Sequence, residues 1–204
     1  MRNACMPLAA LVLTLLIGCR QLPWNARAIH ACPGELVPTQ EIAGDFLLRL
    51  HLRVSSEGGS FGFELAVQKV GDELVLVGLH PLGAKLFTLR QTGTDVRVEA
   101  HPAPALEVPP ENILRDVHRV RFLALPPPAA DGVVQGRRGT REIREHWEAG
   151  RLRERRFFRT GDGEATAEIA FTGTDAAGDE SAVLRHHRCG YRSEFRTLSL
   201  RSLP

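Results

Sequence analysis

ELVLVGLHPLGAKLFTLR, residues 73–90, is the stretch that indicates the fold class most clearly. Two apolar runs rich in Val, Leu and Phe flank a short break, and each run is short enough to be a strand. Pro81 removes a backbone donor and Gly83 permits a positive φ, so the break is typical of a loop between strands. Leu82 is a large apolar residue in that loop. It either folds back onto the core or points outward, toward a lipid or a partner.

The flanking segments alternate apolar and polar residues with a period of two. Residues 46–54 place Phe, Leu and Val on one parity, residues 61–67 repeat the pattern, and residues 95–99 alternate again. Turn residues separate these runs, as at Gly71-Asp72 and Thr92-Gly93. The five runs in a row predict an antiparallel meander.

The period changes to that of a helix after Pro109-Pro110, where apolar residues recur through residue 123. Pro126-Pro127-Pro128 ends this helix, and its apolar face must pack on a sheet. Strand patterns resume after Gly132, and the final pair is expected at about residues 182–191 and 195–200.

The N-terminus has the pattern of a secreted lipoprotein. Residues 8–17 form an apolar run too short to span a bilayer, and Leu16-Ile17-Gly18-Cys19 resembles the bacterial lipobox. We expect a signal peptide at residues 1–18, a lipidated tether and entry segment at 19–44, and one domain at 45–204. Cys19 is then the lipidation site, carrying acyl groups such as palmitate and anchoring the protein to the membrane. The alternative is an ordinary secretory signal in which Cys19 occurs by chance.

Cys32 and Cys189 lie near opposite ends of the mature chain, and the bacterial periplasm permits disulfides. A disulfide between them would stabilise the fold by up to about 5 kcal/mol in the chain-entropy model. The alternative is two buried thiols.

Charge and motifs exclude several classes of function. Basic and acidic residues nearly balance, without the concentrated basic face of a nucleic-acid binder, so no nucleic-acid partner is expected. His186 and His187 should face opposite sides of a strand, and Asp116 and His118 should lie on different helix faces, so neither pair predicts a metal site. Known nucleophile, zinc-protease and phosphate-loop motifs are absent from the sequence. We predict no enzymatic activity and no cofactor.

Nine arginines lie between Arg137 and Arg159, Arg155 among them, and fewer glutamates oppose them. This region is either a solvated strand face or a surface that contacts anionic lipid headgroups.

The order lipobox, meander, Pro-Leu-Gly loop, Pro-started helix and second set of strands resembles LolB-like bacterial lipoproteins with the LolA/LolB-like fold. The resemblance covers roughly residues 40–172, through Pro81-Leu82-Gly83 with Leu86, Phe87 and Leu89, and then 109–125 with Leu114. It implies a mainly β (α+β) fold, a strongly curved, incompletely closed antiparallel sheet or half-barrel, with one or more lid helices. Val117-His118-Arg119 lacks the Trp found in LolB.

The resemblance also implies the site. Pro81, Leu82 and Gly83 would form a membrane-contact loop, and the concave face would hold a lipid or acylated cargo. With Arg20 rather than Asp after Cys19, it implies sorting to the periplasmic face of the outer membrane and a LolA-like periplasmic carrier as partner. The apolar cavity would be lined by Phe46, Leu48, Leu50, Phe61, Phe63, Leu65, Leu74, Leu76, Leu86, Leu89, Ile113, Val117, Val120, Ile169 and Phe171.

Strand parity alone does not distinguish an open cavity from a core filled by its own side chains. The leading hypothesis is therefore a lipoprotein that binds a lipid or acylated cargo and assists its delivery at the membrane. The rival is a structural or adaptor lipoprotein with a filled core that docks a partner in the cell envelope.

Overall fold

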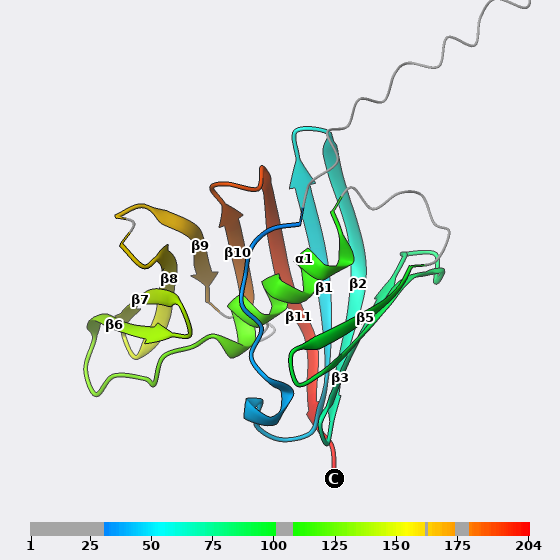
Figure 1. Cartoon of the computed structure of the whole chain (residues 1–204), viewed down its shortest axis with the longest axis horizontal. Helices are drawn as coiled ribbons and strands as arrows, with labels where there is room; N and C mark the ends of the chain where they lie inside the picture. Colours follow the sequence, from blue (N-terminus) through cyan, green and yellow to red (C-terminus); the bar gives the residue numbers. More distant parts are fainter. Residues whose placement is uncertain (1–30, 101–107, 162, 174–179) are drawn as a thin grey trace, which may run out of the picture.

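The period-two segments form one antiparallel sheet of eleven strands in the computed structural model, which describes residues 31–100, 108–161, 163–173 and 180–204 (Figure 1). The strand order is β5-β4-β3-β2-β1-β11-β10-β9-β8-β7-β6. The first five strands are β1 (Phe46–Ser56), β2 (Gly59–Val70), β3 (Glu73–Leu79), β4 (Lys85–Thr92) and β5 (Asp95–Ala100). The others are β6 (Gly132–Arg138), β7 (Arg141–Glu148), β8 (Arg151–Arg159), β9 (Ala165–Thr172), β10 (Ser181–His186) and β11 (Tyr191–Ser202).

The first and last strands lie side by side in the middle of the sheet. β1 pairs with β11 along its whole length, from Phe46 opposite Ser202 to Ser56 opposite Tyr191. Strands β2 to β5 follow on one side, and β10 back to β6 follow on the other. The chain from β5 to β6 must therefore run from one edge of the sheet to the other, and this connection carries the helix.

The predicted fold class is confirmed. β5 and β6 each pair with one neighbour in the described part of the chain, so the sheet does not close into a barrel. Figure 1 shows the sheet curving around the helix, which lies in front of its inner face.

The helix begins at Pro110, where proline suits the first turn, and forms α1 (Pro110–Val117). It continues as the π-helical turn η2 (His118–Phe122), in which the Leu123 amide donates to the His118 carbonyl at 2.8 Å. A short 3-10 turn, η1 (Thr39–Glu41), precedes β1. None of the helices in the described ranges has the length and apolar character needed to cross a bilayer.

One detail of the second half differs from the sequence-based expectation. Tyr191 was expected to end a strand but begins β11, because the turn before it uses a positive φ at Gly190. Strands resume after Gly132 as expected, as β6 and β7, which are separated by a turn at Gly139 with a φ of +55°.

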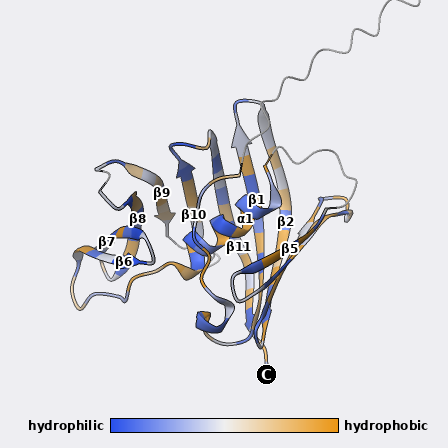
Figure 2. Ribbon diagram, in the orientation of Figure 1, coloured by the Kyte–Doolittle hydropathy of each residue, from blue (hydrophilic) through white to orange (hydrophobic). Residues whose placement is uncertain are grey.

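One apolar layer covers the inner face of the sheet and the facing side of α1. All the side chains predicted to line a cavity belong to it, and hydropathy alternates along the strands accordingly (Figure 2). The Phe87 ring fills the space above Gly78, its partner in the β3–β4 register, and packs edge-on to Phe63 at 6.0 Å between centroids. A Cβ atom at Gly78 would lie under 3.0 Å from three atoms of that ring.

We expect Gly78→Ala to lower the free energy of unfolding by about 1 to 3 kcal/mol, because a methyl group there overpacks the core. Gly62→Ala on β2 is the matched control, since its Cβ would meet its nearest atom at 3.6 Å. Urea unfolding of both variants measures the difference. Equal stabilities would show that the Phe87 ring can move aside without cost.

Candidate functional site: the helix over the inner face of the sheet

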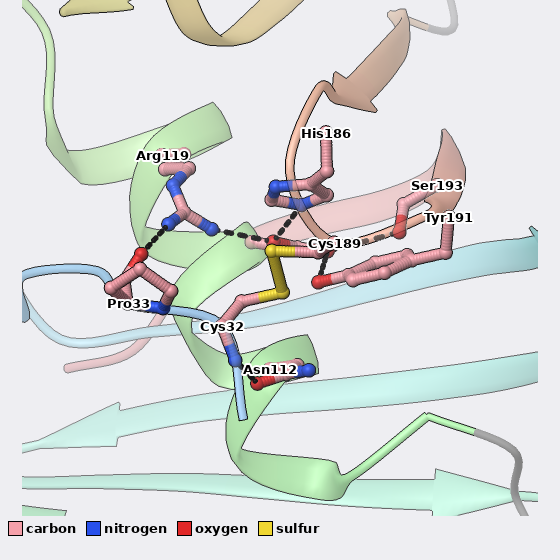
Figure 3. Close-up of a disulfide and its surroundings, with 9 residues drawn as sticks. Cys32, Pro33, Asn112, Arg119, His186, Cys189, Tyr191 and Ser193 are labelled. Atoms are coloured by element: carbon pink, nitrogen blue, oxygen red, sulfur yellow. Dashed lines mark hydrogen bonds and ion pairs between the residues drawn. A yellow bond between two sulfur atoms is a disulfide. The ribbon is translucent and has the colours of Figure 1, made fainter. Parts of the chain in front are cut away.

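The carboxylate of Asp116 holds α1 to the centre of the sheet. Oδ1 accepts hydrogen bonds from His186 Nε2 at 2.8 Å and Arg119 Nη1 at 2.9 Å. Oδ2 accepts from Tyr191 and Ser193, both at 3.0 Å. His186 ends β10, while Tyr191 and Ser193 begin β11, so one helical residue joins both strands (Figure 3).

This cluster is a fastening rather than an exposed reactive centre. Asp116 is fully buried and its hydroxyl and imidazole partners are at most 7% exposed. Burial, and next the charge of Asp116, raises the pKa of Tyr191, which therefore stays protonated and keeps donating. A buried carboxylate is tolerated when donors satisfy both oxygens, and here they do.

A second buried ion pair holds the C-terminal end of the helix. Arg155 Nε donates to Glu145 Oε1 at 2.7 Å, and Arg155 Nη1 donates to the carbonyls of Arg119 and Val120. Glu145 also accepts from the Leu125 amide at 3.1 Å. A cation satisfies the last carbonyls of a helix favourably. Arg155 is only 2% exposed. It is therefore neither part of a solvated strand face nor available to contact lipid headgroups, the two interpretations given for the arginine-rich region.

Residues 31–38, which we call the strap, run across the outer side of α1 and η2. The Cys32 amide donates to Asn112 Oδ1 at 2.8 Å, and Arg119 Nη2 donates to the Pro33 carbonyl at 2.7 Å. A disulfide joins Cys32 to Cys189 in the turn between β10 and β11, with the Cα atoms 6.0 Å apart (Figure 3). The part of the expected tether that the structure describes is therefore packed against the domain.

His118 links the strap to β4. Its Nδ1 accepts from the Val37 amide at 2.9 Å, so Nε2 carries the proton and donates to Gln91 Oε1 at 2.8 Å. Burial, and next the charge of Arg119, lowers the pKa of His118 from 6.5 to about 3. His118 is therefore neutral at neutral pH, as both hydrogen bonds require.

We expect part of the stability of the domain to be lost as the pH falls below about 6.5 toward 3. In that window His118 is protonated in the unfolded chain and neutral in the folded chain. The free energy of unfolding therefore falls by up to about 1.4 kcal/mol for each pH unit. His118→Asn, which keeps an acceptor for Val37, should lose this part of the slope, whereas the exposed His187→Asn should not. Urea unfolding between pH 6.5 and 5 measures it. Parallel curves for the wild type and His118→Asn would contradict the assignment.

The residues predicted to line a cavity are packed rather than open. Leu50, Phe63, Leu74, Leu76 and Ile169 have no exposed surface, and Phe46, Phe61 and Phe171 are half-buried. None of the predicted residues lines either of two pockets formed by described residues. One pocket, of about 420 Å³, lies on the outer face at β1, β10 and β11, and the other, of about 220 Å³, lies between the strap and η2.

The loop between β3 and β4 projects Leu82 into solvent, where the side chain is 88% exposed. The Gly83 amide donates to the His80 carbonyl at 2.7 Å, and the His80 amide donates to the Ala84 carbonyl at 2.8 Å. His80 Nδ1 accepts from the Leu82 amide at 3.1 Å. Pro81 favours this turn, and Gly83 adopts its φ of +85° without strain. Cys19, the predicted lipidation site, lies outside the described residues.

The paired histidines take different places. His186 points inward to Asp116, while His187 lies outside the strand, exposed, with Nε2 at 3.7 Å from Glu168. Donor atoms of Cys32, His186 and Cys189 lie within 4.8 Å of one another, but the two sulfur atoms are bonded in the disulfide.

Sequence reasoning missed the polar contacts that hold the helix. It treated Asp116 and His118 as residues on different helix faces, yet both are fully buried and bind different partners. The available signal was polar residues at 112, 116, 118 and 119 inside an otherwise apolar helical pattern. Their partners in the strap, β4, β10 and β11 are too far away in the chain for any local pattern to name.

Comparison with known sequences adds the family. Residues 48–199 match the family described as "Protein of unknown function (DUF3261)". The chain belongs to this family. No curated protein matches the sequence of this DUF3261 member.

Three solved structures that match this chain share little sequence with it. A LolA superfamily protein from Nitrosomonas europaea is 11% identical, with a TM-score of 0.46 over 79% of this chain and 88% of that one. A domain named for outer membrane lipoprotein sorting, from Vibrio parahaemolyticus, is 13% identical, with a TM-score of 0.39 over 78% and 85%. A DUF1329 family protein from Desulfovibrio piger is 11% identical, with a TM-score of 0.39 over 80% and 88%.

Proposed function

We propose that this protein is an outer-membrane lipoprotein, anchored through Cys19, that binds a lipid or acylated cargo between α1 and the inner face of the sheet and assists its delivery at the membrane. The observation that carries the proposal is the continuous apolar layer of an open sheet, covered by one short helix. A small number of identifiable polar contacts hold the helix in place, and the proposal requires them to open when cargo binds. The resemblance to LolB-like lipoproteins supports the same reading, with a LolA-like carrier as the supplier of cargo.

A lipid can replace the apolar contacts that the helix loses on opening. Lifting the helix exposes Ile113, Leu114, Val117 and Val120, which are at most 6% exposed. Exposing four such side chains costs about 6 to 12 kcal/mol. An acyl chain with about 15 methylenes regains about 12 kcal/mol when it takes their place against the sheet. A bound chain of about 8 to 15 methylenes can therefore replace the apolar contacts of the helix.

The rival function is that of an adaptor whose core is permanently filled and which docks a partner in the cell envelope. The complete burial of Leu50, Phe63 and Ile169 favours it. The two functions differ in whether the helix moves, so the strap offers a test.

We expect a fluorescent fatty acid to bind the wild-type domain, and to bind about tenfold faster after Cys32→Ser/Cys189→Ser, because freeing the strap takes about 1.4 kcal/mol from the opening barrier. Stopped-flow fluorescence measures the rate. Gly78→Ala is the matched control, since it destabilises the core while leaving the strap fastened. If neither the wild type nor the serine variant takes up the probe, the adaptor function stands and lipid binding is wrong.

We expect Leu82→Glu to slow transfer of the bound probe to lipid vesicles about tenfold, because burying one leucine in a bilayer contributes only about 2 kcal/mol and a carboxylate forfeits it. The free energy of unfolding should change by less than about 0.5 kcal/mol, as expected for an exposed position. Lys85→Glu, also exposed at the end of this loop, controls for charge. Unchanged transfer by Leu82→Glu would exclude the loop from delivery.

A further inference from the structure

Three arginines form a row across β6, β7 and β8. Arg138 lies directly opposite Arg141, and Arg141 lies directly opposite Arg159. Opposed residues of an antiparallel pair point to the same face, with Cβ atoms about 5 Å apart. Like charges in this arrangement repel, so the row requires an explanation.

This row belongs to the inner face of the sheet. Arg141 has the same parity as Ile143, and Arg159 the same parity as Phe157, and both apolar residues are buried in the core. The arginines therefore continue the apolar layer to its rim, at the end of the sheet formed by β6, β7 and β8 (Figure 1). We call Arg138, Arg141 and Arg159 the rim arginines.

No carboxylate among the described residues lies within ion-pair distance of a rim arginine. Arg141 Nη1 is 3.4 Å from Thr166 Oγ1, and Arg138 Nη2 is 3.5 Å from the Ala124 carbonyl, which are long contacts to neutral groups. Burial lowers the pKa of Arg141, and the charges of Arg119, Arg159 and Arg188 lower it further, against Glu35 alone. Glu35 itself accepts hydrogen bonds from the amide and hydroxyl of Thr140.

The outer face of the same strands shows how such a pair is neutralised. Arg144 lies directly opposite Arg156. Both have the opposite parity to Arg141 and Arg159, so they point to the outer face. Arg156 Nη2 is 2.7 Å from Glu154 and 3.7 Å from Glu168, and Arg144 Nη2 is 3.7 Å from Glu142. The fold thus supplies carboxylates to the outer pair and leaves the inner row without them.

A pocket of about 220 Å³ adjoins Arg138. Leu36, Val37, Phe122 and Leu123 contribute apolar walls, and Arg138, Glu35 and Glu41 also line it. Arginine is suited to phosphate because its planar guanidinium donates two parallel hydrogen bonds. A cationic row beside these apolar walls matches a molecule with an anionic head and an alkyl chain.

We propose that the rim arginines bind a phosphate group, and that the ligand of this protein is an anionic amphiphile whose headgroup lies at this rim. The acyl part of this inference rests on the proposed function, whereas the phosphate site stands on the arginine row alone. The phosphate would take the place of the missing carboxylates and relieve the repulsion between Arg141 and Arg159.

The test compares two ligands that share an alkyl chain, dodecyl phosphate and dodecyl maltoside, both below their micellar concentrations. We expect calorimetry to show wild-type protein binding dodecyl phosphate at least about tenfold more tightly, since charge-assisted hydrogen bonds to the phosphate are made in addition to the alkyl contacts. Arg141→Gln/Arg159→Gln should abolish this preference and leave dodecyl maltoside binding unchanged. Its melting temperature should equal or exceed that of the wild type, because a like-charge pair is removed.

Arg144→Gln/Arg156→Gln is the matched control, since it removes an opposed pair from the same strands on the outer face. It should keep the preference for dodecyl phosphate. If it loses the preference as fully as the inner variant does, or if the inner variant keeps it, the site is wrong.

Measurements with inorganic phosphate distinguish free phosphate from a lipid headgroup as the bound anion. They also distinguish failure of the phosphate site from failure of the lipid-binding function. If phosphate alone raises the melting temperature of the wild type but not of Arg141→Gln/Arg159→Gln, and neither alkyl ligand binds, the site holds free phosphate and the lipid function fails. If dodecyl phosphate binds in an arginine-dependent way and inorganic phosphate does not compete, the headgroup assignment holds. If dodecyl maltoside and dodecyl phosphate bind equally, lipid binding stands and the phosphate site is overturned.

Discussion

Four hydrogen bonds to the carboxylate of Asp116 are the constraint on which the rest of the structure depends. An isolated carboxylate in a protein interior is strongly disfavoured, so Asp116 can be buried only where β10, β11 and Arg119 meet it. That requirement sets the position of α1 on the sheet more sharply than apolar packing does, because apolar contacts are non-directional. Once the helix is placed there, Ile113, Leu114 and Val117 seal the inner face.

The remaining polar contacts extend this arrangement along the helix in both directions. Arg155 and Glu145 hold its C-terminal end to β7 and β8, and His118 joins it to Gln91 and to the strap. The disulfide then fastens the strap to the turn beside the Asp116 cluster. The domain therefore combines an apolar interior with a helix that is held by a few identifiable polar contacts and by the strap.

Charge is distributed unevenly over the two faces at the far end of the sheet. The outer arginines of β7 and β8 are matched by glutamates, whereas the inner row borders the pocket beside the strap. The carboxylate that β7 does carry on its inner face, Glu145, is already paired with Arg155 and does not reach the row. The inner row thus brings positive charge without an ion-pair partner to the rim of the apolar interior.

The sequence by itself determined the antiparallel strand series and the Pro81–Leu82–Gly83 turn, because period-two alternation and proline–glycine chemistry are local properties of the chain. It also identified the helix, through its proline start and its apolar spacing. The outward direction of Leu82 was settled by the tertiary structure. Only the tertiary structure decided that β1 pairs with β11, that Asp116 meets His186, Tyr191 and Ser193, and that Arg141 lies between Arg138 and Arg159. These partners are brought together by the path of the whole chain across the sheet. The sequence next to a residue does not specify which distant residues it will meet.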